Sequence, residues 1–120
     1  MATALLAVER VGDTLVVTLL ADLAELQFQQ IESEARDVVG LVNDPSVRNI
    51  VLDFQQTVYF GSSALGFFVR LWQKVSRRGG HMACCNLSAL EKEILRFTRL
   101  DTLWSVCGSR EEAMQQVGTE

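Results

Sequence analysis

The chain has 120 residues, 48% of them hydrophobic, which suits a single domain with one core over residues 1–120. Its formal net charge is −4, from 11 Lys and Arg against 15 Asp and Glu, which argues against a surface built to bind nucleic acid. No apolar run approaches the roughly 20 residues of a membrane-spanning helix, so we expect no membrane insertion.

The first third of the chain predicts a β-hairpin and then a helix. Two apolar segments, around Leu5–Arg10 and Thr14–Leu20, flank a turn at Gly12-Asp13. The apolar start lacks a basic region, so we interpret it as the first strand and not as a signal peptide. Asn43-Asp44-Pro45 ends the helix. Its apolar residues recur at steps of three and four: Phe28, Ile31, Ala35, Val38, Val39 and Val42.

The middle of the chain predicts a strand, a helix and a second strand. Arg48–Phe54 is a nearly continuous apolar run, as expected for a strand buried on both faces. A helix from about Ser63 to Arg78 follows, and Gly79-Gly80 stops it. His81–Asn86 is the next strand.

The last third predicts two more helices and a short strand. Ser88 and Glu91 have the spacing of a capping box at the start of the third helix, whose expected inner stripe is Leu90, Ile94 and Phe97. Leu103–Cys107 is the last strand. Ser109 can cap the final helix, whose first turn carries Glu111 and Glu112.

The predicted order is β-β-α-β-α-β-α-β-α. After the opening hairpin, strands and helices alternate strictly, which is typical of an α/β fold with helices packed on a sheet. We therefore expect a mixed, mostly parallel central β-sheet with about four helices.

The second helix is expected to have two distinct sides. At about 100° per residue, one apolar side should pack on the sheet: Leu65, Phe68, Val69, Trp72 and Val75. The opposite side should face solvent: Ser63, Phe67, Arg70, Lys74 and Arg77. We interpret Phe67 as a partner contact on this side. The cations alone are better explained as a solvated face, helped by the position of Arg77 and Arg78 near the negative end of the helix.

Little in the sequence indicates a metal, a cofactor or catalysis. The cysteines Cys84, Cys85 and Cys107 have no metal-ligand spacing, so we interpret them as small buried residues of a reducing, cytoplasmic protein, with redox sensing as the weaker alternative. His81 is the single histidine, which makes a zinc site improbable. A serine, His81 and Asp53 could form a catalytic set only if the fold brought them together, and no pattern places them so.

The strand, loop and helix around Ser63 carry a family resemblance. Leu52-Asp53, a short loop and Gly61-Ser62-Ser63-Ala64-Leu65-Gly66 resemble the pattern of the STAS domain, the fold of bacterial anti-sigma factor antagonists. Gly79-Gly80 before a strand and Leu95–Leu100 before the last strand fit the same pattern, so the resemblance covers nearly the whole chain.

The resemblance implies a transcription regulator that works by partner switching and is not an enzyme. A kinase that is also an anti-sigma factor would phosphorylate Ser63, with Ser62 as runner-up, and a serine phosphatase would reverse this. The expected partner-binding surface combines residues of the resembling segments with the exposed side of the second helix: Asp22, Gly61, Ser62, Ser63, Phe67, Arg70 and Lys74. Asp53 would support the loop or face the partner. A homodimer is left open.

Four positions depart from the family pattern. Gly61 replaces an aspartate, Ala64 replaces a glycine, and the loop Ala21-Asp22-Leu23-Ala24 keeps one carboxylate where the family usually has two. Ser63 therefore keeps its hydroxyl in a less acidic neighbourhood. Two alternatives follow: Ser63 is only a helix N-cap worth ~1 kcal/mol, and the chain is an accessory or scaffold STAS subunit of a transport ATPase or signalling complex that works without phosphorylation.

Overall fold

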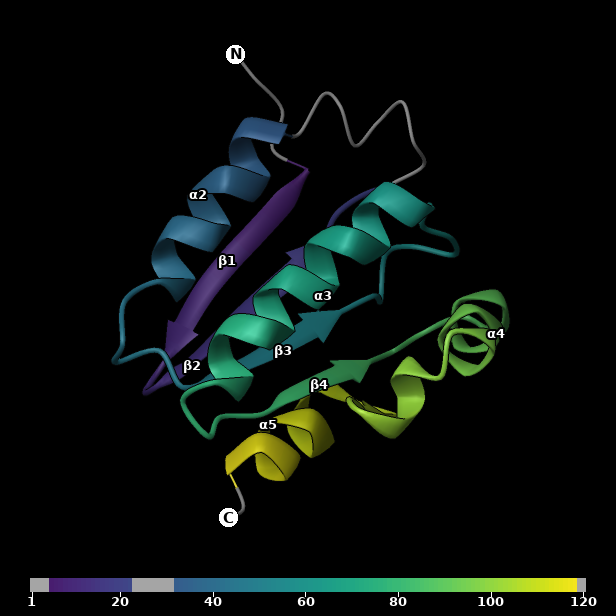
Figure 1. The fold of residues 1–120 in the computed structure, drawn as a ribbon. Coiled ribbons are helices and arrows are strands. Elements are labelled where there is room, and N and C mark those ends of the chain that lie inside the picture. The colour runs from purple at the N-terminus through teal and green to yellow at the C-terminus, as the bar shows by residue number, and fades with distance from the viewer. Residues whose placement is uncertain (1–4, 23–31, 119–120) are drawn as a thin grey trace.

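The computed structural model describes residues 5–22 and 32–118 (Figure 1). The opening hairpin is formed by β1 (Leu6–Val11) and β2 (Thr14–Leu19), joined at Gly12-Asp13. The later strands are β3 (Asn49–Asp53), β4 (Met82–Cys85) and β5 (Ser105–Cys107). The helices are α2 (Glu32–Val42), α3 (Ser62–Ser76), α4 (Ala89–Phe97), the short 3-10 helix η1 (Leu100–Thr102) and α5 (Arg110–Gly118).

The five strands form one mixed sheet in the order β1-β2-β3-β4-β5. β1 pairs antiparallel with β2, and each later strand is parallel to its neighbour. Element order and sheet type confirm the α/β architecture predicted from the sequence. Because the parallel strands all run the same way, their carboxyl ends meet at one edge of the sheet.

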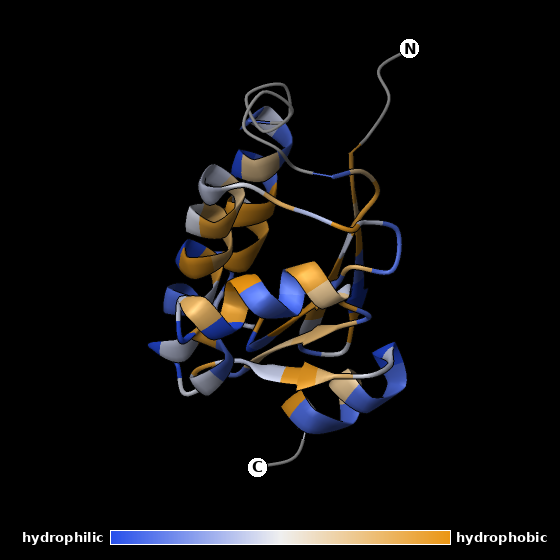
Figure 2. Ribbon diagram, turned by 90° about the vertical axis from the view of Figure 1, so that its right-hand side faces the viewer, coloured by the Kyte–Doolittle hydropathy of each residue, from blue (hydrophilic) through white to orange (hydrophobic). Residues whose placement is uncertain are grey.

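The two faces of the sheet are covered unequally. The larger cluster of buried side chains lies between one face and α2, α3 and α4, and includes Leu15, Ile50 and Leu52 from the strands. On the other face, among the described elements, α5 covers a smaller cluster that includes Val51 and Cys85. Figure 2 shows this helix as largely hydrophilic, with apolar residues where it meets the strands. β3 is buried along its full length, as its apolar run predicted.

The first predicted helix packs as expected where it is described. Ala35, Val38 and Val42 are buried, and Val39 packs against the same cluster. The other two members of the predicted stripe, Phe28 and Ile31, lie outside the described residues.

The predicted faces of two other helices are correct only in part. On α3 the predicted inner residues are buried or pack against the core: Leu65, Phe68, Val69, Trp72 and Val75. Phe67 is only 1% exposed, so its predicted place on the solvent face is wrong. On α4 Ile94 packs against the core as predicted and Leu95 is buried, whereas Leu90 and Phe97 are 51% and 80% exposed.

The three cysteines are buried and form no disulfide. Cys84 lies in the larger cluster, and Cys85 and Cys107 lie under α5. Burial raises the pKa of all three thiols; that of Cys85 rises to about 12, with the charge of Asp53 as a second cause. Such thiols stay protonated at neutral pH, which makes them poor nucleophiles.

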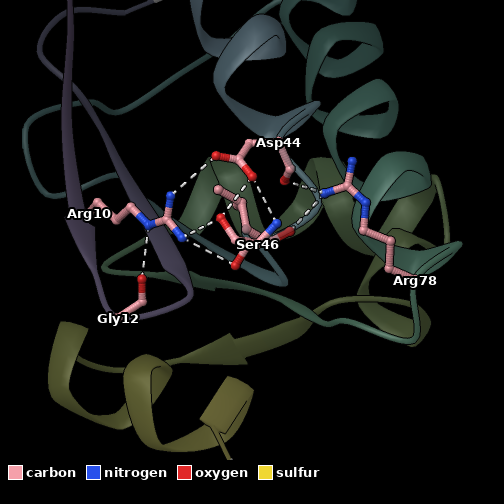
Figure 3. A network of polar contacts seen from close by, with 6 residues as sticks. Arg10, Gly12, Asp44, Ser46 and Arg78 are labelled. Atoms are coloured by element: carbon pink, nitrogen blue, oxygen red, sulfur yellow. Dashed lines mark hydrogen bonds and ion pairs between the residues drawn. The ribbon is translucent and has the colours of Figure 1, made fainter.

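A polar network joins the hairpin turn to the far ends of α2 and α3 (Figure 3). The guanidinium of Arg10 donates to the carbonyl of Gly12 at 2.9 Å and to Oγ of Ser46 at 2.8 Å, and lies 3.7 Å from the carboxylate of Asp44. Arg78, just beyond α3, donates to the carbonyls of Asp44 and Val47 at 3.1 and 2.7 Å. The network therefore fixes the edge of the sheet opposite the carboxyl ends of the parallel strands.

Asp44 gives this network a pH dependence. Hydrogen bonds from the backbone N–H and side chain of Ser46 hold the pKa of Asp44 below its usual value of 3.8, because they favour the charged carboxylate. A lowered folded-state pKa stabilises the protein above the unfolded pKa, and this contribution is lost as the pH falls through the folded value. We expect Asp44→Asn to lower the melting temperature slightly at about pH 7, with the difference from wild type shrinking as the pH falls below 3.8. A difference that stays constant as the pH falls would contradict this.

Candidate functional site

The candidate site lies at the edge of the sheet where the parallel strands end. The loop after β3 leads directly into α3, whose first residues are Ser62 and Ser63. Both serines are exposed. The helix starts one residue earlier than predicted, with Gly61 at the N-cap position and no side-chain cap. Ser63 is therefore the second helical residue, and its alternative role as N-cap is wrong.

The first turn of α3 favours a negative charge. Its backbone N–H groups have no partners within the helix, and the helix dipole places partial positive charge there. The turn contains no acidic residue that would already neutralise this charge. A phosphate on an exposed serine hydroxyl at this point would be stabilised locally.

The loop before the serines is held by hydrogen bonds from three directions. Asp22, beyond the end of β2, accepts a hydrogen bond from the backbone N–H of Val58 at 2.9 Å. The buried Asp53 accepts from the backbone N–H of Gln55 and from the side-chain amide of Asn86, both at 3.0 Å. Asp22 and Asp53 thus position the loop, and Asp53 is directed inward.

The third direction comes from the start of α4. The hydroxyl of Thr57 donates to the carboxyl of Glu91 at 2.6 Å, and both residues are buried. Ser88 and Glu91 form the predicted capping box, and the hydroxyl of Ser88 also donates to the carbonyl of Val58 at 2.7 Å. The capping box was predictable from local spacing, but the bond to Thr57, 34 residues away, was not.

Two apolar residues of this loop reach solvent. Val58 and Tyr59 are 61% and 39% exposed, whereas the next residue, Phe60, packs against Phe54 and Phe68 in the core. The sequence reasoning missed this pair. The available signal was their place in a short loop between a buried strand and the serines, where a side chain need not face the core.

The remaining predicted residues lie in different surroundings. Gly61 is buried and Arg70 is exposed. Lys74, in the last turn of α3, is partly buried. Phe67 is inside, as described above. Ala24, where the family pattern has a second carboxylate, lies outside the described residues.

The catalytic set considered from the sequence is not assembled. His81 precedes β4, at the opposite end of the sheet from Asp53 and Ser63, because Asp53 pairs with Cys85 at the end of β4. Within residues 5–22 and 32–118, no group of three acidic, histidine or cysteine residues could hold a metal ion. No helix in the described part of the chain is long and apolar enough to cross a membrane.

Comparison with known proteins agrees with this architecture. The sequence pattern of the STAS domain matches residues 6–113. An anti-sigma-factor antagonist (STAS) domain protein from Planctomyces limnophilus is 24% identical with a TM-score of 0.82, over 95% of this chain and 98% of that chain. A putative anti-sigma factor antagonist from Thermotoga maritima is 19% identical with a TM-score of 0.82, over 94% of each chain.

A third structure is the Bacillus cell fate determinant SpoIIAA in its phosphorylated form. It is 19% identical with a TM-score of 0.69, over 93% of this chain and 98% of that chain. At these identities the likeness establishes the shared fold, while the roles of individual residues depend on the site itself.

Proposed function

This chain belongs to the STAS domain family, and from that premise we propose that it is a regulatory binding module that works by partner switching. In this proposal it binds an anti-sigma factor that is also a serine kinase, in the cytoplasm, and phosphorylation of Ser63 ends the binding. A serine phosphatase restores it. The supporting observation is the exposed Ser63 in the first turn of α3, a turn that itself contains no acidic residue.

The switch has a simple physical basis. Phosphorylation adds about −1.5 to −2 charges and three strong acceptor oxygens. The start of α3 stabilises that charge within the protein. A partner surface that covers Ser63 would have to bury the same charge, which disfavours the complex.

The surface around Ser63 suits a protein partner. Val58 and Tyr59 offer exposed apolar contact area beside the serines, and tyrosine is enriched among the residues that dominate binding energy. They take the place in our proposal that Phe67 had in the sequence analysis. Asp22 lies at the same edge through its bond to Val58.

Substitution of Ser63 tests the switch. With the anti-sigma factor kinase encoded nearest to the gene, we expect Ser63→Asp to weaken binding by about a hundredfold (~2.7 kcal/mol) and Ser63→Ala to change it little. Intact mass after incubation with ATP should show one phosphate on the wild type and none on Ser63→Ala. Ser62→Ala should still take up one phosphate; if it takes up none, the phosphorylated residue is Ser62 and not Ser63.

A matched control keeps the charge change but moves it along the helix. Ser76→Asp places the same carboxylate at the other end of α3, about 20 Å away, and should leave binding intact. Phosphate that persists on Ser63→Ala, or equal loss of binding by both aspartate variants, would contradict the Ser63 switch.

The second candidate function is an accessory or scaffold STAS subunit of a transport ATPase or signalling complex, without phosphorylation. Gly61 favours it, because this buried glycine stands where the family pattern has an acidic residue beside the serines. It predicts a stable complex that Ser63→Asp does not disturb, which is the opposite of the result expected above.

A further inference from the structure

The charges of this chain are distributed unevenly along α3. Between Asp53 and Glu91 the sequence contains no acidic residue, although the chain as a whole carries a net charge of −4. The basic residues of this segment are Arg70, Lys74, Arg77 and Arg78.

Three of these cations make no ion pair within residues 5–22 and 32–118. Arg78 is bound to the carbonyls of Asp44 and Val47. The other three, Arg70, Lys74 and Arg77, take part in none of the salt bridges of this part of the chain, which join Arg10 to Asp44, Arg96 to Glu93, and Arg110 to Glu9. We call these three residues the α3 cationic stripe.

The stripe lies on the side of α3 that carries Ser63, although Phe67, between Ser63 and Arg70 on that side, is buried. At 100° per residue its three members lie within about 40° of the direction of Ser63 around the helix axis. Arg70 follows Ser63 by seven residues, or about 10 Å along the helix, which is close to the Debye length of about 8 Å at physiological salt. A charge bound near Ser63 is therefore felt by the start of the stripe.

Stabilisation of the helix end does not explain the whole stripe. Lys74 and Arg77 lie near the carboxyl end of α3, where cations complement the helix dipole. Arg70 lies in the middle of the helix, where the dipole effect has died away, since it is confined to the first and last turns. Arg70 is also exposed, so its side chain does not pack in the core.

We propose that the α3 cationic stripe binds an acidic surface of the protein partner. This inference rests on the proposed function, because it assigns the charge of the partner that covers Ser63. Opposite charges across an interface raise the association rate and select the right partner. A protein partner fits better than nucleic acid, because the stripe has only three cations on an acidic chain and the loop that leads into α3 exposes the apolar Val58 and Tyr59.

The stripe also increases the effect of phosphorylation on partner binding. A phosphate on Ser63 repels an acidic partner and at the same time screens Arg70 from it. The same modification thus acts twice on one interface, and the stronger effect is expected at low salt, where charges interact over longer distances.

The test compares two triple variants, each of which removes three positive charges. One replaces the stripe by Arg70→Gln, Lys74→Gln and Arg77→Gln. The control replaces exposed cations on and after α4 by Lys92→Gln, Arg96→Gln and Arg99→Gln. The probe is fluorescein-labelled poly-L-glutamate, followed by fluorescence anisotropy at low and physiological salt, with a short DNA duplex and phosphatidylglycerol vesicles as competing anions.

We expect the wild type and the control to bind poly-L-glutamate in a salt-sensitive way and the stripe variant to bind about tenfold more weakly, at about twofold per exposed pair. Equal binding by the two variants would overturn the proposal. Tighter binding of the duplex or the vesicles than of the polypeptide would also overturn it, because it would assign the stripe to another class of partner.

The kinase complex separates this inference from the proposed function. If Ser63→Asp abolishes binding to the kinase while the stripe variant binds like its control, the switch stands and the acidic partner surface is wrong. If the stripe variant alone loses binding, the stripe stands and the Ser63 switch is wrong.

Discussion

Replacing Gly80 by alanine is expected to destabilise the protein by on the order of 4 kcal/mol or more, because there is no room for a single added carbon. A Cβ at this position would lie 1.6 Å from the carbonyl oxygen and 2.7 Å from the carbonyl carbon of Arg48. Both atoms belong to the backbone that enters β3, so they cannot move away as a side chain would. A loss of this size is a large part of the 5–15 kcal/mol that stabilises a typical domain.

The surrounding hydrogen bonds explain why the chain passes so closely. The N–H of Gly80 donates to the carbonyl of Val75 at 2.8 Å, and the N–H of Gly79 donates to that of Ser76 at 3.1 Å, which closes α3 with the pattern of a Schellman motif. These bonds bring Gly80 back against Arg48. The contact therefore sets where α3 ends and where β4 begins.

Urea unfolding of three glycine variants measures this effect. Gly79 has a φ of +78°, and a Cβ there would meet only the guanidinium end of Arg48 at an ordinary contact distance of 3.8 Å, so Gly79→Ala should cost only about 1–2 kcal/mol of backbone strain. Gly66, in the middle of α3, has nothing near its Cβ position, and Gly66→Ala should stabilise the protein by about 0.5–1 kcal/mol. A loss below about 1 kcal/mol in Gly80→Ala would contradict the predicted overlap.

Replacing Glu91 by alanine is expected to cost about 3 kcal/mol and to loosen the loop before Ser63. The side chain accepts from the backbone N–H of Ser88 at 2.9 Å and from the hydroxyl of Thr57 at 2.6 Å, with no exposed surface of its own. The alanine removes half of the capping box, worth about 1 kcal/mol, and leaves a buried hydroxyl with a poorer partner, worth about 1–3 kcal/mol.

Glu91→Gln is the matched control, because it keeps the shape and most of the hydrogen bonds. Its amide oxygen can accept from the N–H of Ser88, and its NH2 can donate to Thr57, whose hydroxyl then turns to the carbonyl of Phe54 at 3.3 Å. We expect a loss of less than about 1 kcal/mol. Hydrogen exchange of the amides of Thr57 and Val58 should accelerate in Glu91→Ala and stay near wild type in Glu91→Gln. Unchanged exchange in both would contradict the positioning role.

The sequence predicted the element order and the sheet because these depend on local signals. Gly12-Asp13 marks the hairpin, and the continuous apolar run of β3 marks a strand covered on both sides, as the structure confirms. Ser109 also caps α5 as predicted, since its hydroxyl accepts from the N–H of Glu112 at 3.1 Å. In each of these cases the deciding residues are neighbours in the chain.

The faces of α3 and α4 were not predictable in the same way. Apolar residues occupy more than half of the circumference of α3, so several inward directions fit the sequence equally well. The structure selects the one centred on Ala64 and Leu71, because the sheet lies beneath the helix and α2 packs alongside. On α4 the inward direction is set by Glu91, whose partner Thr57 is distant in the sequence.

The order of the strands in the sheet is also their order in the chain, which bears on how the molecule assembles. Each new strand adds to the growing edge, and no strand has to be inserted between two that have already paired. The strands can therefore pair one after another as the chain is synthesised, starting with the hairpin of β1 and β2. Within the described residues, α5 follows all five strands and docks on the face opposite α2, α3 and α4.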